Sequence, residues 1–204
     1  MIAIVDYGVG NLFSLRSSLQ YLGAHAAVTA DADTLRRADH LILPGVGAFA
    51  DAAEKLRAAG LDRVVIEAAQ AGTPLLGVCL GMQLLLERSF EYGEHRGLGL
   101  IPGDVSPMAP ALPAGLKVPH IGWNALHFPP DRPRSPIFRD LREGDHVYFV
   151  HSYYAHPCPA VTATTGYGAE LTAAVGLGNV FGCQFHPEKS GPVGLSILRA
   201  FCEL

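Results

Sequence analysis

The first half of the chain alternates short apolar runs with stretches of helical spacing. Apolar runs of strand length occur at 2–5, 26–29, 41–43 and 74–78. Helices are predicted at 12–22, 34–38, 48–59, 62–71 and 80–88. In the first of these helices Asn11 is the expected N-cap and Gly23 ends the apolar face. Strands that are apolar on both faces and alternate with helices predict a parallel sheet covered on both sides.

From about residue 97 the pattern becomes β-rich. Nine prolines between 102 and 136 exclude long helices there. Strands are predicted at 118–128, at 146–154 and, with a glycine turn at 176–178, within 162–185. Pro192 opens a final helix over 193–202. No repeat or linker is visible, so we expect one α/β domain spanning 1–204, with an open, mostly parallel sheet, helices on both faces and a β-rich second half.

Composition and charge exclude several classes of protein. Hydrophobic residues make up 49% and charged residues 17% of the chain, which is typical of a packed globular protein. The net charge of −4 argues against nucleic-acid binding, and no basic run indicates a membrane surface. The apolar N-terminus has no preceding basic residues and reaches Asp6 at once, so it does not resemble a signal peptide. We expect a cytoplasmic protein without nucleic-acid or membrane partners.

The cysteines and histidines give no indication of a metal site. The four cysteines form no CxxC pair, and the nine histidines include no HExxH. We therefore expect no metal and no cofactor. Cys158, Cys183 and Cys202 are interpreted as small buried side chains.

Cys79 differs because two glycines surround it in the stretch GVCLGMQ. It lies where a predicted strand meets a predicted helix, which is the position of the nucleophile in a G-x-S-x-G elbow. A helix N-terminus favours the thiolate. The alternative is a buried cysteine in a glycine-rich turn, an arrangement that chance gives about 2% of the time for four cysteines.

Two further stretches contain groups that a nucleophilic cysteine requires. In QFHPEKS, His186 and Glu188 are two residues apart and would project to the same side of an extended segment, as a base and its orienting carboxylate. A surface histidine beside a glutamate is the alternative. In LPGVGAF, the loop 45–47 offers backbone N–H groups at Val46 and Gly47 that, with the N–H of Leu80, would form an oxyanion hole. An ordinary turn after a strand is the alternative there.

Together these stretches resemble the class I, triad-type glutamine amidotransferases over nearly the whole chain. The stretches IVDYGVGNLFSL, VPHIGWN and FVHSYY resemble, more narrowly, the family of glutaminase subunits of imidazole glycerol phosphate synthase. The resemblance implies glutamine hydrolysis through a thioester on Cys79, with His186 as base and acid and Glu188 orienting it. It also implies that Gln83 and the backbone around Gly47, Ser152 and Tyr153 bind glutamine.

The partner that the resemblance implies is a cyclase subunit with a (β/α)8 barrel, which forms a heterodimer with the glutaminase and receives its ammonia. Asn11, Trp123 and Lys189 lie near the subunit interface in that family. From the residues alone, Asn11 is equally well explained as a helix cap, Trp123 as a core aromatic and Lys189 as a solvated charge.

Three alternative functions remain open from sequence. The chain could serve another amidotransferase, such as one making anthranilate, GMP or pyridoxal phosphate, against which the DYGVGN and HIGWN stretches argue. It could be a Cys-His hydrolase on a related fold, against which Gln83 and the late position of the His-Pro-Glu stretch argue. It could be a non-catalytic binding domain, which the intact nucleophile, base and carboxylate disfavour.

Overall fold

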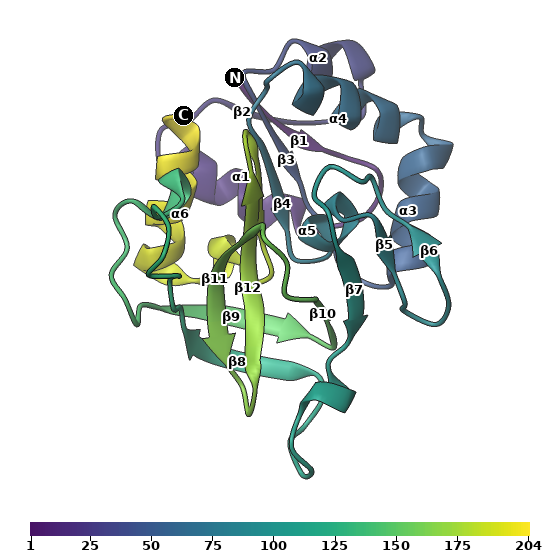
Figure 1. Ribbon diagram of the computed structural model, residues 1–204. Helices are drawn as coiled ribbons and strands as arrows, with labels where there is room; N and C mark the ends of the chain where they lie inside the picture. Colours follow the sequence, from purple (N-terminus) through teal and green to yellow (C-terminus); the bar gives the residue numbers. More distant parts are fainter.

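The computed structural model describes all 204 residues and is built around a seven-stranded sheet (Figure 1). The order of its strands is β11-β12-β13-β4-β3-β1-β2. The strands are β1 (Ile2–Val5), β2 (Ala26–Thr29), β3 (His40–Leu43), β4 (Leu75–Val78), β11 (Val161–Gly166), β12 (Glu170–Leu177) and β13 (Val180–Cys183). The five strands from β13 to β2 are parallel, and β12 and β11 are antiparallel. The open, mostly parallel sheet predicted from the alternating pattern is confirmed.

Helices cover both faces of this sheet, as the sequence predicts (Figure 1). The helices are α1 (Leu12–Tyr21), α2 (Ala32–Arg36), α3 (Phe49–Ala58), α4 (Leu61–Gln70), α5 (Leu80–Leu85) and α6 (Gly191–Cys202). Successive side chains of a strand point to opposite faces, so Ile2 and Ile4 join one core with α1 and α6. Ala3 and Val5 join a second core with α2, α3 and α4. One buried core therefore lies on each face of the sheet, and the two cores stabilise the sheet edge at which α5 starts.

Residues 88–155 add two small sheets that the sequence pattern indicates only in part. One has the order β10-β7-β5-β6, and the other pairs β8 with β9. Their strands are β5 (Arg88–Ser89), β6 (His95–Arg96), β7 (Asp104–Pro107), β8 (His120–Ala125), β9 (His146–His151) and β10 (Tyr153–Ala155). Short 3-10 turns lie at η1 (Ala109–Ala111), η2 (Pro136–Phe138) and η3 (Pro187–Lys189).

Several details differ from the sequence-based expectations. The strand predicted over 118–128 spans only His120–Ala125, and the helices predicted over 34–38 and 193–202 begin two residues earlier than predicted. The helix predicted over 80–88 ends at Leu85, because the chain extends at Leu86 and pairs Arg88 with Asp104 in the second sheet. The strand predicted over 146–154 is interrupted at residue 152 and divides between two sheets. The glycine turn predicted at 176–178 falls after residue 177, where β12 ends. Asn11 precedes α1, but its side chain does not cap the helix.

None of the helices combines the length and the apolar character needed to cross a membrane. The four cysteines are all free, with Cys79 and Cys183 buried and Cys158 and Cys202 only half-buried. The expectation of a buried side chain is therefore confirmed for Cys183 and wrong for Cys158 and Cys202.

Candidate active site

Cys79 occupies a sharp turn between β4 and α5. Its backbone has φ 56° and ψ −112°, a left-handed conformation that non-glycine residues seldom adopt. A Cβ atom at Gly77 would lie 2.8 Å from the carbonyl of Gly81, and one at Gly81 would overlap the carbonyl oxygen of Leu43. The two glycines therefore let α5 pack directly on the ends of β3 and β4. This close packing is why Cys79 projects from the edge of the sheet.

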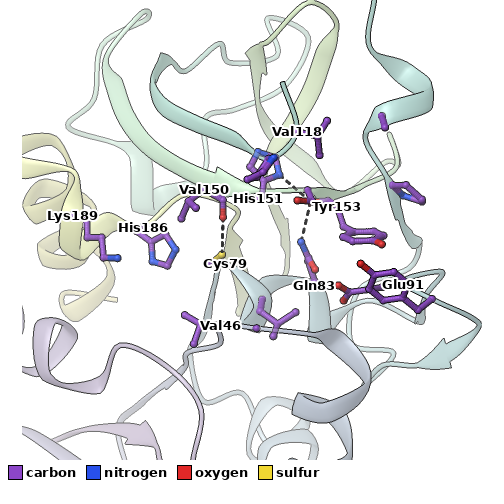
Figure 2. A pocket seen from close by; sticks show the side chains of 17 residues that line it. Val46, Cys79, Gln83, Glu91, Val118, Val150, His151, Tyr153, His186 and Lys189 are labelled. Atoms are coloured by element: carbon purple, nitrogen blue, oxygen red, sulfur yellow. Dashed lines mark hydrogen bonds between the residues drawn. The ribbon is translucent and has the colours of Figure 1, made fainter. Parts of the chain in front are cut away.

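His186 follows β13 and lies beside Cys79 (Figure 2), and Glu188 contacts its ring from the far side of Pro187 in the sequence. Nδ1 of His186 is 2.8 Å from Oε1 of Glu188, and the two side chains are only 2% and 1% exposed. The predicted pairing is therefore present, but the predicted extended segment is wrong. Glu188 belongs to the 3-10 turn η3, which begins at Pro187 and folds the carboxylate back onto the ring.

Backbone hydrogen bonds fix the position of the imidazole. The N–H of His186 donates to the carbonyl of Tyr148 at 3.0 Å. The hydroxyl of Ser190 donates to the carbonyl of His186 at 2.6 Å and accepts from the N–H of Tyr148 at 3.0 Å. These contacts join η3 to β9 and fix the backbone at His186, and the contact with Glu188 orients the ring.

The electrostatic environment favours a charged imidazole. Burial lowers the pKa of His186, but the contacts with Cys79 and Glu188 outweigh it and raise the pKa to about 9. The Cys79 sulfur lies 4.0 Å from the carbonyl oxygen of Val150 and 3.9 Å from Nε2 of Gln184. The second carboxylate oxygen of Glu188 is buried without a partner, while Nδ2 of Asn11 lies 3.5 Å from the first. Asn11, predicted as a cap or an interface residue, thus contacts the carboxylate of Glu188.

A cavity of about 660 Å³ opens above Cys79 (Figure 2). The cavity is lined by all four residues that were predicted to bind glutamine, namely Gly47, Gln83, Ser152 and Tyr153. Nε2 of Gln83 donates to the carbonyl of Tyr153 at 3.1 Å and to Oε1 of Gln184 at 3.0 Å. Gln83 is therefore held between the carbonyl of Tyr153 and Gln184, which lies next to Cys79.

The predicted oxyanion loop reaches the same cavity. Val46, Gly47 and Leu80 line it, and the N–H groups of Val46 and Gly47 donate to no other group of the protein. Gly47 has φ +89° and open space around it, whereas a Cβ at Gly45 would lie 2.6 Å from the N atom of Gly81. The loop is therefore fixed at Gly45 and unobstructed at Gly47.

Glu91 is a cavity residue that the sequence did not predict. Its side chain lies near Gln83 in Figure 2, and the residue is 8% exposed. One carboxylate oxygen accepts from the N–H of Phe49 at 2.6 Å, at the start of α3. Glu91 is the only acidic residue that lines the cavity. The stretch EYGEH around it has no periodicity, so only its spatial position reveals it.

The three predicted interface residues lie close to this site, but only Lys189 lines the cavity. Lys189 lines the cavity, and its Nζ lies 6.0 Å from the centre of the Tyr148 ring. Trp123 on β8 packs edge-on against the same ring, with centroids 6.1 Å apart, and is 53% exposed. The interpretation of Trp123 as a core aromatic is therefore wrong. No group of three or more His, Cys, Asp or Glu side chains is placed to hold a metal ion.

Comparison with known proteins agrees with this geometry. The profile of the family "Glutamine amidotransferase class-I" matches residues 3–203. The chain is 50% identical over 205 residues to the imidazole glycerol phosphate synthase subunit HisH of Moorella thermoacetica, covering 100% of this chain and 94% of that one. It is 47% identical over 206 residues to the HisH subunit of Caldanaerobacter subterraneus subsp. tengcongensis, covering 100% and 98%.

Solved structures show the same fold at lower identity. A crystal structure of a glutamine amidotransferase superimposes with a TM-score of 0.76 at 22% identity, covering 100% of this chain and 98% of that one. The chain belongs to the class I glutamine amidotransferases and, within them, to the family of HisH subunits, the glutaminase subunits of imidazole glycerol phosphate synthase.

Proposed function

We propose that the chain hydrolyses glutamine to glutamate and ammonia through a thioester on Cys79, and that the ammonia passes to a partner cyclase. The observation that carries the proposal is the strained elbow at Cys79 beside the buried His186–Glu188 pair, at the base of a cavity. The function as a glutaminase subunit in histidine biosynthesis follows from the family.

In the first half of the reaction His186 takes the proton of the Cys79 thiol, and the sulfur attacks the side-chain amide carbon of glutamine. The oxyanion that forms accepts hydrogen bonds from the N–H of Leu80 and from the Val46–Gly47 loop. The C–N bond then breaks as His186 returns the proton to nitrogen, which leaves as ammonia. A thioester between Cys79 and the glutamyl group remains.

In the second half a water molecule attacks the thioester and gives its proton to His186. The C–S bond breaks, the sulfur recovers the proton, and glutamate leaves. Glu188 holds the ring through Nδ1, which leaves Nε2 to exchange protons with the sulfur and the leaving nitrogen. Each proton that enters the imidazole therefore leaves it within one cycle.

The amino-acid end of glutamine has charges that the far side of the cavity can match. We assign its ammonium group to Glu91, because this is the only carboxylate on the cavity wall and one of its oxygens is not used by Phe49. Gln83, Ser152 and Tyr153 also line the cavity and would supply the remaining polar contacts. Glutamine then spans the cavity from Glu91 to Cys79.

For the partner we propose a (β/α)8-barrel cyclase subunit that forms a heterodimer with this chain. There the ammonia would join a phosphoribulosyl-formimino nucleotide to give imidazole glycerol phosphate and an aminoimidazole carboxamide ribotide. Trp123 and Ile121 on β8 are 53% and 59% exposed, and Lys189 and Asn11 lie next to the triad. This face supports docking of the partner where ammonia would leave.

The test is ammonia release from glutamine by the full chain, alone and with the barrel subunit and its nucleotide. Cys79→Ser is expected to abolish release while the melting temperature stays close to that of the parent. A diazo-ketone analogue of glutamine should label Cys79 alone. Labelling at Cys183, or hydrolysis that survives Cys79→Ser, would overturn the assignment.

A further inference from the structure

A chain of hydrogen bonds leads from the cavity into the β8–β9 sheet through two imidazoles. His151 ends β9 and lines the cavity, and its Nδ1 lies 2.9 Å from the carbonyl oxygen of Tyr153. Its Nε2 lies 3.1 Å from Nδ1 of His120 on β8. Nε2 of His120 lies 2.7 Å from Oδ1 of Asn124, whose Nδ2 donates to the carbonyl of Gly166 at 2.8 Å. None of these groups belongs to the triad.

Counting hydrogens shows that this chain is incomplete when both imidazoles are neutral. Both ends of the chain are carbonyl oxygens, which only accept. In the arrangement of the structure the two rings make three contacts that each need one N–H hydrogen, towards Tyr153, between the rings and towards Asn124. A neutral imidazole supplies one. Two neutral rings therefore fall one hydrogen short, and one added proton would satisfy all three contacts.

The surroundings keep that additional proton away at neutral pH. Burial lowers the pKa of His151 to about 4 and also lowers the pKa of His120. His120 stacks between the uncharged rings of Phe149 and Tyr167, with centroids 5.0 Å and 4.1 Å away. His186 is the charged neighbour across the cavity, and it lowers the pKa of His151 further. The other titratable side chains around the cavity are Cys79, Glu91, Tyr92, Tyr153 and Lys189.

With only two N–H hydrogens, the neutral hydrogen-bond chain lacks one contact. The contact that is lost is the one whose loss costs the least free energy. The Asn124–Gly166 contact is exposed, so water can replace it, whereas the Tyr153 carbonyl is partly buried. The neutral state is therefore one in which both rings carry hydrogen on Nδ1 and the amide NH2 of Asn124 turns towards His120. The orientation of Asn124 in the structure, with Oδ1 facing His120, is the one that suits the protonated pair.

We propose that His120 and His151 act as one proton-binding pair that positions the glutamine-binding turn, and that the neutral pair is the active form. The proposal rests on the proposed glutaminase function. In both forms His151 holds the carbonyl of Tyr153, which Gln83 also contacts, so the two forms differ in charge and in the orientation of Asn124. An added proton would place a second cation near the imidazolium of His186, so it disfavours the charged form of His186 that the reaction uses.

Asn124 offers a test because Asn124→Asp places a negative charge next to His120, while Asn124→Ala loses the same Nδ2 donor to Gly166 without adding charge. In Asn124→Asp the carboxylate stabilises the added proton, and we expect the pair to titrate at least about one pH unit higher than in the parent. The acid limb of kcat/KM should move upward by the same amount. Asn124→Ala is the matched control, because it removes the acceptor without adding charge. The acid limb of the kcat/KM profile of Asn124→Ala should stay in place or move to lower pH.

The pair is observed directly by ¹⁵N NMR of histidine-labelled full chain across pH, which does not depend on activity. At pH 7.5 both rings of the parent are expected as neutral Nδ1–H tautomers. An Nε2–H tautomer at His151, or equal titration of the pair in Asn124→Asp and the parent, would overturn the proposal. If Asn124→Asp does not fold, the tautomers of the parent decide alone. Expected NMR titrations in a chain without glutaminase activity would instead refute the proposed function.

Discussion

Replacing Gly45 with alanine tests whether the oxyanion loop is held by direct contact with α5. The new Cβ would lie 2.6 Å from the N atom of Gly81 and 2.9 Å from Cβ of Leu80. Gly45 does not have a positive φ, so the effect is steric and not conformational. Restoring a separation of 3.0–3.4 Å would move the loop away from the helix by about 0.4–0.8 Å. The N–H group of Leu80 belongs to the helix and that of Gly47 to the loop. The displacement would therefore move these two proposed oxyanion donors apart.

The expected losses follow from this displacement. Overpacking of this kind costs about 1–3 kcal/mol, which lowers the melting temperature of a chain of this size by roughly 2–12 °C. Losing one oxyanion donor costs about 10²–10³-fold in turnover. We therefore expect kcat for ammonia release to decrease about 10²-fold in Gly45→Ala, measured at saturating glutamine at a temperature where the variant is folded.

Gly166→Ala is the matched control, because a Cβ there meets no atom within 4 Å and the residue has no positive φ. Its stability should change by no more than about 0.5 kcal/mol. If Gly45→Ala keeps the turnover of the parent, the loop does not depend on this contact and the reasoning is refuted.

Further predictions concern the triad and its control. Glu188→Gln should retain more residual ammonia release than His186→Ala, because Glu188 orients the ring and His186 transfers protons; the reverse order would reassign the roles. Burial lowers the pKa of His186, but Cys79 and Glu188 raise it to about 9, so a pH–rate profile should show turnover declining as the pH rises through about 9. By the same linkage, chemical denaturation should show that this proton stabilises the fold fully below about pH 6.5 and progressively less towards pH 9. Turnover that is constant up to pH 10 would contradict this pKa. The isolated chain should release ammonia slowly, and the liganded barrel should stimulate it mainly in kcat; full activity without the partner would refute control through the Val46–Gly47 loop.

The parts of the fold that follow from sequence are those whose residues repeat with a period. The buried strands and their helices are recognisable because each strand side chain faces one of two cores, as Ile4 and Val5 do. The second sheet is not, because β5 and β6 have two residues each and no hydrophobic alternation. Its existence depends on pairing between segments that are distant in the chain, such as Arg88 with Asp104.

The site divides in the same way. The sequence identifies Cys79, His186 and Glu188, because the spacing of the glycines and the His-Pro-Glu stretch reflect geometry that is local in the chain. Glu91 is not identifiable from the sequence, because its place in the cavity wall depends on contacts between distant segments. One of these is its contact with Phe49 at the start of α3, 42 positions away. The role of Asn11 was likewise hidden, since its contact with Glu188 joins residues 177 positions apart.

The packing around the elbow also limits how the proposed partner would control the proposed oxyanion hole. A glycine at both position 45 and position 47 would, from the sequence alone, let the loop peptides rotate at low steric cost. In the structure Gly45 lies against the start of α5, so movement there would disturb Cys79 and the helix together. Gly47 has open space, φ +89° and an unused N–H group. A rotation that changes the number of oxyanion donors without disturbing the nucleophile is therefore confined to the peptide between Val46 and Gly47. The energy for it must come from a partner that binds one orientation more tightly than the other.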